Sequence, residues 1–200
     1  MRLLGLDKDC FASWWAKLPE GSTMLVQPKI EGYAIGLRYK YGQLVDAYSR
    51  DKSTIIENIR TINAIPLSID DSLKVEVELE GILYSPTYDS NFSKDGLFSN
   101  IIPKIDSNTH LLFLAFQIFC SNSDELSDLT QLQNWGFEVP ITLRTDDPRQ
   151  VKIWHSQWIK KELFSNLPTN GIVAKCNSFS TKNILGVSPS SPNWALALTQ

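Results

Sequence analysis

The spacing of apolar residues predicts a short helix and three extended segments at the start of the chain. Apolar residues recur at helical spacing from Asp7 to Leu18, and Pro19 then ends the pattern. Three extended segments follow, separated by turns at Glu31-Gly32 and Tyr41-Gly42. Short turns between extended segments predict an antiparallel meander. Its strands are expected at residues 23–30, 34–39 and 43–49.

Helices and strands are mixed along the rest of the chain without a regular βαβ order. Isoleucines at helical spacing predict one helix, and two longer amphipathic segments predict two more, the first of them capped by Ser123. A segment rich in Ser, Asn, Asp and Pro lacks periodicity, as is typical of a long surface loop. This order predicts an α+β fold of antiparallel sheets flanked by helices. The helices are expected at 55–62, 124–135 and 151–163, the strands at 73–84, 111–119, 172–176 and 194–198, and the loop at 84–108.

Size and charge restrict the number of domains and the kind of partner. The chain of 200 residues, 42% of them hydrophobic, is long enough for one domain or at most two small ones, and a single compact domain is expected. A formal net charge of −3 and a pI near 5.4 argue against a protein that binds many nucleic-acid phosphates at once. We therefore expect any contact with DNA to be weak or to need help from a partner protein.

The cysteines and the N-terminus indicate a cytoplasmic protein. The cysteines are far apart and, with the two histidines, have no zinc-ligand spacing, so free thiols in a reducing compartment are expected. Charged residues follow Met1 too early for a signal peptide, and the longest apolar run, Leu111–Cys120, is about half a membrane span. No association with a membrane is expected. The residues concerned are Cys10, Cys120, Cys176, His110 and His155.

A lysine followed by an acid and a glycine ends the first extended segment, in the sequence Lys29-Ile30-Glu31-Gly32. Taken alone, it is most simply an exposed lysine at the end of a hairpin strand. However, it resembles the K-x-D-G motif of covalent nucleotidyltransferases, and its surroundings resemble the adenylation domain of NAD-dependent DNA ligases over nearly the whole chain. The other matching stretches are 3–7, 37–45, Ser49-Arg50-Asp51, 57–62 with 65–67, Trp135-Gly136-Phe137, 167–168, 170–175 and 192–197.

The resemblance implies the covalent nucleotidyltransferase fold and a reaction that forms a lysyl-AMP intermediate. In this family an unprotonated lysine amine attacks the α-phosphorus of NAD or ATP, and the AMP later passes to a DNA 5′-phosphate. Lys29 holds the position of that lysine. A lysine amine has a pKa of about 10.4 in water, so the site must lower it with neighbouring cations or partial burial. Lys175 and a bound Mg²⁺ are the cations expected to lower this pKa.

Further residues match family positions that contact the nucleotide. Arg50 matches an arginine on the ribose and phosphate side, and the alternative is a loop arginine in solvent. Phe116 matches the aromatic residue that stacks on adenine, and the alternative is an ordinary core phenylalanine. Lys175 matches a catalytic lysine at the α-phosphate, and the alternative is a strand-end lysine with a buried stem. The expected nucleotide contacts are completed by Glu31 and Gly32 of the lysine motif and Leu6 of the opening segment.

Three glutamates alternate with apolar residues in the strand predicted at 73–84. Glu78 or Glu80 is expected to bind Mg²⁺, a hard cation that takes oxygen ligands and keeps several waters. The alternative is a strand with one solvent-exposed face, which suits Glu76. The family has a glutamate near this point, and the match gives either Glu80 or Ile82. We favour Glu80 as a catalytic and nucleotide-binding residue, because isoleucine cannot hold a ribose hydroxyl or a metal.

Several departures from the family pattern remove charge. Asn170 replaces an aspartate, Gln27 a glutamate and Thr199 a lysine, and only Lys104 is left in a stretch that carries two arginines in the family. We expect neither an upstream NMN-binding domain nor a downstream OB-fold, so both NAD and ATP stay open as the AMP donor. The leading hypothesis is a DNA ligase-type AMP-transferring enzyme. The alternatives are a catalytically degenerate nucleotide-binding or interaction domain with the ligase fold, and a capping-type or RNA-directed nucleotidyltransferase.

Overall fold

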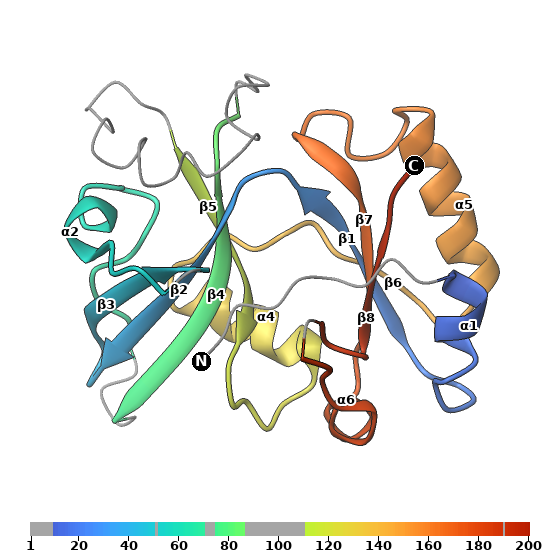
Figure 1. The fold of residues 1–200 in the computed structure, drawn as a ribbon, viewed down its shortest axis with the longest axis horizontal. Coiled ribbons are helices and arrows are strands. Elements are labelled where there is room, and N and C mark those ends of the chain that lie inside the picture. The colour runs from blue at the N-terminus through green and yellow to red at the C-terminus, as the bar shows by residue number, and fades with distance from the viewer. Residues whose placement is uncertain (1–9, 51, 71–74, 87–110, 190) are drawn as a thin grey trace. The chain divides into compact units, whose positions relative to one another are not determined.

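The computed structural model divides into two compact units, each with its own sheet (Figure 1). Residues 10–50, 52–70, 75–86, 111–189 and 191–200 are described. The described residues within Glu31–Ser121 and Asp128–Val139 form the first unit. The described residues within Leu4–Ile30, Asn122–Ser127 and Pro140–Gln200 form the second unit.

The sheet of the second unit is antiparallel, with strands in the order β6 (Leu143–Thr145), β1 (Met24–Ile30), β7 (Thr169–Cys176), β8 (Ala195–Leu198). Successive side chains of a strand point to opposite faces of its sheet. Val26, Ile172 and Leu196 belong to a hydrophobic core that also includes Trp14 and Val151. Burying an aliphatic side chain of this size contributes roughly 1.5–3 kcal/mol, so this face is the stabilising one. Lys29 lies an odd number of residues from Val26 and therefore belongs to the opposite face.

Two helices contribute to the core of the second unit, and a third follows β7. They are α1 (Phe11–Trp15), α5 (Pro148–Ile159) and α6 (Phe179–Leu185). The Asp147 carboxylate accepts a 2.8 Å hydrogen bond from the backbone N–H of Arg149, which caps α5, and Pro148 occupies its first turn. Ser178 accepts from the N–H of Thr181 at 3.3 Å and caps α6 in the same way.

The sheet of the first unit is also antiparallel, with strands in the order β3 (Gln43–Ser49), β2 (Tyr33–Lys40), β4 (Glu76–Tyr84), β5 (Leu112–Ile118). One face is apolar. There Tyr39 packs edge-on against Phe137, with ring centroids 6.2 Å apart, and its hydroxyl donates to the Pro66 carbonyl at 2.6 Å. The short helix α2 (Ile56–Ile59) follows β3 and buries Ile59. Helix α4 (Glu125–Asn134) begins among residues of the second unit and ends among residues of the first.

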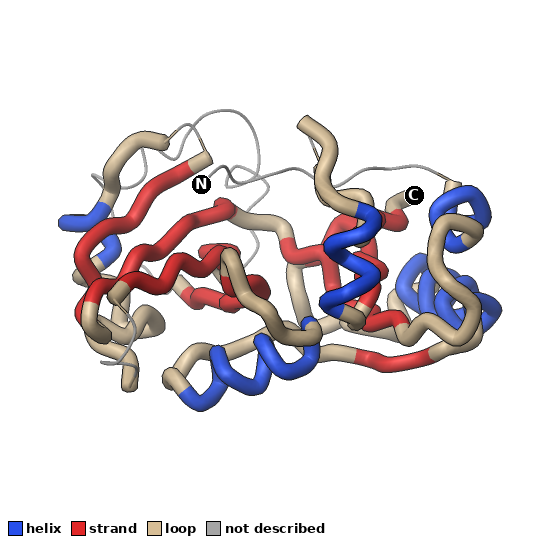
Figure 2. Tube along the Cα trace, turned by 90° about the horizontal axis from the view of Figure 1, so that it is seen from below, coloured by secondary structure: helices blue, strands red, loops and turns tan. Residues whose placement is uncertain are grey.

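The predicted α+β class with antiparallel sheets is confirmed, and Figure 2 shows the helices and strands. The predicted three-strand meander is wrong at its first strand. β2 and β3 pair as predicted, whereas β1 pairs with β6 and β7. The Glu31-Gly32 connection is therefore not a hairpin turn. A Cβ at Gly32 would lie 2.3 Å from the Leu83 carbonyl oxygen, so glycine here permits the close approach of β4.

The remaining predicted strands are present, and the helices differ in extent. Within the described residues, the first two predicted helices are short and cover Phe11–Trp15 and Ile56–Ile59. α5 begins at Pro148, ahead of the predicted residue 151. Strand β6 and helix α6 were not predicted. Most of the loop predicted at 84–108 lies outside the described residues. Every helix that the structure describes is too short or too polar to cross a lipid bilayer.

Candidate functional site

Lys29 lies near the end of β1, on the face of the sheet away from the hydrophobic core. Its Nζ donates a 2.5 Å hydrogen bond to Oδ1 of Asn170, which is in β7. The pairing of β1 with β7 shifts register between Pro28 and Ile30, directly at Lys29. Two places before it, Gln27 is buried and donates to the Thr142 hydroxyl at 3.0 Å. The lysine of the predicted motif is thus half-buried and held by an uncharged acceptor.

Gly171 allows β8 to approach this part of the sheet. Its φ is +154°, and a Cβ built there would lie 2.5 Å from the Leu198 carbonyl oxygen and 3.1 Å from Cγ2 of Thr199. The pairing Ile172↔Leu198 places Thr199 next in register, beside Gly171. Thr199 therefore lies next to the residue that follows Asn170, the hydrogen-bond partner of Lys29.

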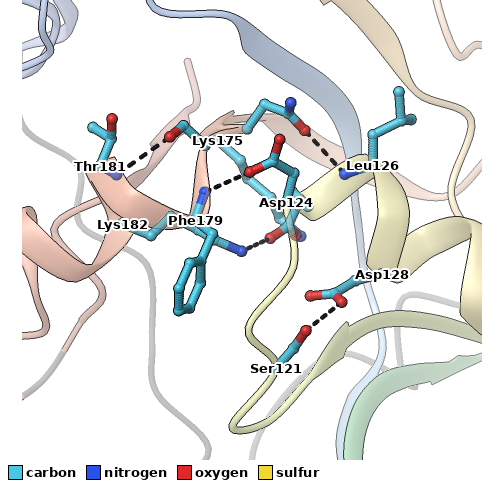
Figure 3. A network of polar contacts seen from close by, with 11 residues as sticks. Ser121, Asp124, Leu126, Asp128, Lys175, Phe179, Thr181 and Lys182 are labelled. Atoms are coloured by element: carbon cyan, nitrogen blue, oxygen red, sulfur yellow. Dashed lines mark hydrogen bonds and ion pairs between the residues drawn. The ribbon is translucent and has the colours of Figure 1, made fainter.

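Lys175 takes part in a buried cluster of three charges, together with Glu125 and Lys182. Figure 3 labels the two lysines of this cluster. Nζ of Lys175 lies 2.7 Å from Oε1 of Glu125, and Nζ of Lys182 lies 2.8 Å from Oε2. The Glu125 side chain is 2% exposed and that of Lys175 6%. Burial acts to raise the pKa of Glu125, but the two ammonium groups outweigh it and hold the pKa below its ordinary value. Lys175 is accordingly a cation whose charge is already balanced by a carboxylate.

The start of α4 is tied to the residues between β7 and α6. The backbone N–H of Glu125 donates to the Asn177 carbonyl at 2.9 Å, and that of Leu126 donates to Asn177 Oδ1 at 3.0 Å. In return, Asp124 accepts from the N–H of Phe179 at 2.8 Å (Figure 3). Because these bonds satisfy backbone donors at two helix starts, they fix the Glu125 carboxylate in front of both lysines.

The first unit has a polar sheet face opposite its apolar one. Arg38 lies at its centre, with Nε 2.8 Å from Glu78 and 3.5 Å from Glu76, and with Nη1 3.7 Å from Asp46. The Glu78 carboxylate is therefore already engaged by a guanidinium. Within the described residues, no group of three or more His, Cys, Asp or Glu side chains is placed to hold a metal ion. This arrangement does not fit a metal cage made by the protein alone, and the Mg²⁺ assignment of Glu78 and Glu80 stays a prediction.

Glu80 and Tyr48 flank Gly36 on the same polar face. Gly36 pairs with Tyr48 on one side and with Glu80 on the other. A Cβ on Gly36 would lie 2.2 Å from Cζ of Tyr48, so the tyrosine ring lies flat across this glycine. Tyr48 is 6% exposed and Glu80 5%. Among the described residues, the Tyr48 hydroxyl has no hydrogen-bond partner.

The other predicted nucleotide contacts of the first unit lie near strand ends or irregularities. Arg50 follows β3 and is exposed, and Glu31 and Gly32 precede β2. Phe116 is half-buried where the pairing of β4 with β5 shifts register. The predictions for Leu6 and Lys104 fall outside the described residues. Lys29 and Lys175 thus share a sheet face in the second unit, whereas Arg50, Glu80 and Phe116 belong to the first.

Comparison with known proteins assigns the family. The family model for the NAD-dependent DNA ligase adenylation domain matches residues 7–199. The chain belongs to this family.

Relatives of the adenylation domain family include the DNA ligases of Prochlorococcus marinus (strain NATL2A), 30% identical over 211 residues, and of Anoxybacillus flavithermus, 26% identical over 196 residues. These alignments cover 88% and 84% of this chain, but 31% and 29% of the relatives. The chain thus spans about a third of the length of the curated ligases that it matches.

Solved structures show that the adenylation domain fold is shared with other ligases. An archaeal ATP-dependent RNA ligase aligns with a TM-score of 0.64 at 12% identity, covering 100% of this chain and 48% of that one. A putative ATP-dependent DNA ligase from Aquifex aeolicus aligns with a TM-score of 0.58 at 13% identity, covering 88% and 47%. At such low identity these likenesses show the fold alone.

Two residues of this adenylation domain were missed in the sequence. The pattern around Glu125 predicts only an amphipathic helix, and an acid in the first turn of a helix is usually a solvated surface residue. The pattern around Tyr48 predicts only a strand. A signal for Tyr48 existed in hindsight, since a glycine in the middle of β2 indicates that a neighbouring group needs the space.

Proposed function

We propose that this chain is the AMP-accepting part of a DNA ligase-type nucleotidyltransferase, and that Lys29 forms the lysyl-AMP intermediate. The observation that carries the proposal is the position of Lys29 at the end of β1, hydrogen-bonded to Asn170, in a chain whose family match covers both residues. NAD is the AMP donor that the family favours, and ATP is the alternative. By relation to the DNA ligases, we propose a nicked DNA as the final acceptor.

The proposed step is a displacement at the α-phosphorus of the donor. The Lys29 ammonium first gives a proton to solvent. The neutral amine nitrogen then forms a bond to phosphorus while the bond from phosphorus to the leaving group breaks, and the nitrogen releases a second proton to solvent. The leaving group is nicotinamide mononucleotide from NAD or pyrophosphate from ATP. The Asn170 amide oxygen orients the amine, and it favours the charged ammonium less than a carboxylate would. An asparagine at this position is therefore compatible with the reaction.

Intact-protein mass spectrometry tests the proposal. The chain is incubated with Mg²⁺ and either NAD or ATP and then weighed. We expect the mass to increase by one AMP group, with an adduct that resists dilution but is released by acid, as a phosphoramidate is. Absence of an adduct with both donors, in a preparation that is folded by circular dichroism, would refute the proposed reaction.

Thr199→Lys is expected to accelerate formation of the adduct, since Thr199 lies beside Gly171, next to the partner of Lys29. A lysine there would add a cation near the reacting phosphate and would disfavour the charged form of Lys29. Placing one such group is worth roughly 2.7–4 kcal/mol in optimised sites, and we discount this to about 1–2 kcal/mol in an unoptimised one, or about five- to thirty-fold. Single-turnover rates of AMP attachment measure the effect. Thr199→Met, of similar length without the charge, is the control, and equal rates for Thr199→Lys and Thr199→Met would contradict the prediction.

A second candidate function is a nucleotide-binding or interaction domain that no longer transfers AMP. The observation that favours it is the buried pairing of Lys175 with Glu125, which balances a cation that the family places at the α-phosphate. Threonine at position 199, where the family has a lysine, favours the same candidate function. This candidate predicts reversible nucleotide binding without a covalent adduct, so the mass measurement separates the two.

The net charge of −3 also limits what this chain does with DNA. Non-specific DNA binding draws most of its free energy from clustered Lys and Arg. We therefore propose that stable binding to a nick requires basic surfaces from a partner protein or from other domains.

A further inference from the structure

Tyr48 carries a polar group whose purpose the fold does not explain. Its hydroxyl is buried and has no hydrogen-bond partner among the described residues. Leaving a buried hydroxyl unsatisfied is unfavourable, and native structures usually satisfy such groups with protein, water or ligand. Tyr39, on the apolar face of the same sheet, is satisfied by the Pro66 carbonyl.

The position of Tyr48 is set by Gly36. The phenol lies across this glycine, because Cζ and the hydroxyl oxygen would be 2.2 and 2.6 Å from a Cβ at that position. Glu80 pairs with Gly36 from the other side. The tyrosine ring therefore extends across β2 in the direction of Glu80, and no hydrogen bond joins the two side chains among those described.

Glu80 and Tyr48 offer complementary chemistry to a hydroxyl group. A carboxylate only accepts hydrogen bonds, whereas a phenol donates one. Burial, followed by the negative charges of Glu78, Glu80 and others, raises the pKa of Tyr48 to about 12, so the phenol keeps its proton at neutral pH. A ligand hydroxyl between them would donate to Glu80 and accept from Tyr48. The Arg38 guanidinium is already held by carboxylates and does not compete for this role.

We propose that Tyr48 is a nucleotide-binding residue that, together with Glu80, recognises one hydroxyl of the ribose of an adenine nucleotide. The inference rests on the proposed function, because it takes the nucleotide as the ligand of this sheet face. It adds a residue outside the lysine motif and gives a structural reason for the glycine at position 36. The interaction is reversible and does not require transfer of AMP.

Titration calorimetry with AMP, 2′-deoxy-AMP and 3′-deoxy-AMP tests the inference on wild type and Tyr48→Phe. We expect Tyr48→Phe to weaken AMP binding about three- to tenfold, the range of one hydrogen bond to a neutral group. One of the two deoxy analogues, the one that lacks the recognised hydroxyl, should bind both proteins equally. Tyr39→Phe is the matched control, since it removes a buried tyrosine hydroxyl from the same sheet and should lower thermal stability without changing AMP affinity.

Three other outcomes overturn the inference. Equal AMP affinity for wild type and Tyr48→Phe means that an ordered water alone satisfies the hydroxyl. A similar loss for AMP and both deoxy analogues means that the ring acts through its shape and not through a ribose hydroxyl. Failure of wild type to bind AMP at millimolar concentration removes the ligand altogether. If wild type binds AMP selectively through Tyr48 but forms no adduct with NAD or ATP, the proposed reaction fails while the inference stands.

Discussion

Lys29→Ala should abolish the covalent AMP adduct while leaving the protein folded. The proposed reaction needs an amine at the end of β1, and no other lysine lies in the motif that the family uses. Lys29 is half-buried and faces away from the hydrophobic core, so its truncation opens no cavity in that core. The loss should therefore be complete within detection, with little change in melting temperature. Mass spectrometry of both proteins after incubation with NAD or ATP measures it.

Lys29→Arg is the control that separates charge from nucleophilicity. A guanidinium keeps the positive charge and can still donate to Asn170, but it stays protonated at any usable pH. We expect Lys29→Arg to form no adduct and to bind AMP more tightly than Lys29→Ala. A full adduct on either variant would place the reactive amine elsewhere in the chain.

Glu125→Gln should destabilise the protein by about 3–5 kcal/mol, the usual effect of removing one partner from a buried ion pair. The substitution keeps the shape of the side chain but leaves Lys175 and Lys182 buried without their counter-charge. The amide NH₂ group of the new glutamine would also face one of the two ammonium groups. Because both groups only donate hydrogen bonds, they cannot pair. Urea unfolding followed by circular dichroism measures the change.

The effect of Glu125→Gln should depend on pH in a defined direction. The pKa of Glu125 is lower in the folded protein than its ordinary value, so its ionised form stabilises the fold above the unfolded-state pKa of about 4.3. That stabilisation is lost as the pH falls through the lower folded-state pKa. The difference between wild type and variant should therefore be full at pH 7 and shrink in acid.

Two further variants check the cause of this destabilisation. Glu57→Gln removes a glutamate that is 82% exposed and lies 3.5 Å from Arg60, and it should change stability little. Lys182→Met in the Glu125→Gln background removes one of the two uncompensated charges and should recover part of the loss. No recovery, or a loss from Glu57→Gln as large as that from Glu125→Gln, would contradict the assignment.

Local sequence patterns predicted where the strands and helices lie better than they predicted which strands pair with one another. Alternation located β2, β3 and β4 within a few residues, because each strand has one buried face. The pairing of β1 with β7 was not visible, because it joins residues that are about 150 apart in sequence and depends on no local turn. The short strand β6 carries too few residues for a recognisable pattern, and α6 was missed although Ser178 and Gly186 mark its ends.

The candidate site can be predicted from sequence only as far as motifs determine it, and its residue roles stay predictions. The lysine motif indicated Lys29, and the structure adds that an amide holds its amine. The ion pair between Glu125 and Lys175 was not predictable, because the two residues lie 50 apart in sequence and nothing in their spacing connects them. The unsatisfied hydroxyl of Tyr48 likewise depends on which strand lies beside β3 and on the space left by Gly36.

The boundary between the two units falls within α4, since Ser127 belongs to the second unit and Asp128 to the first. Neither unit is a continuous stretch of sequence, so a single recombination crossover cannot exchange one unit for that of a relative. Replacing residues 31–121 alone would import a new sheet while retaining the old end of α4, whose buried Leu129 and Leu132 belong to the original partner surface. An intact exchange needs a second segment, residues 128–139. Chimaeras that carry both segments should therefore fold more often than those that carry one. Among members of this family, substitutions in one of the two segments should be accompanied by substitutions in the other.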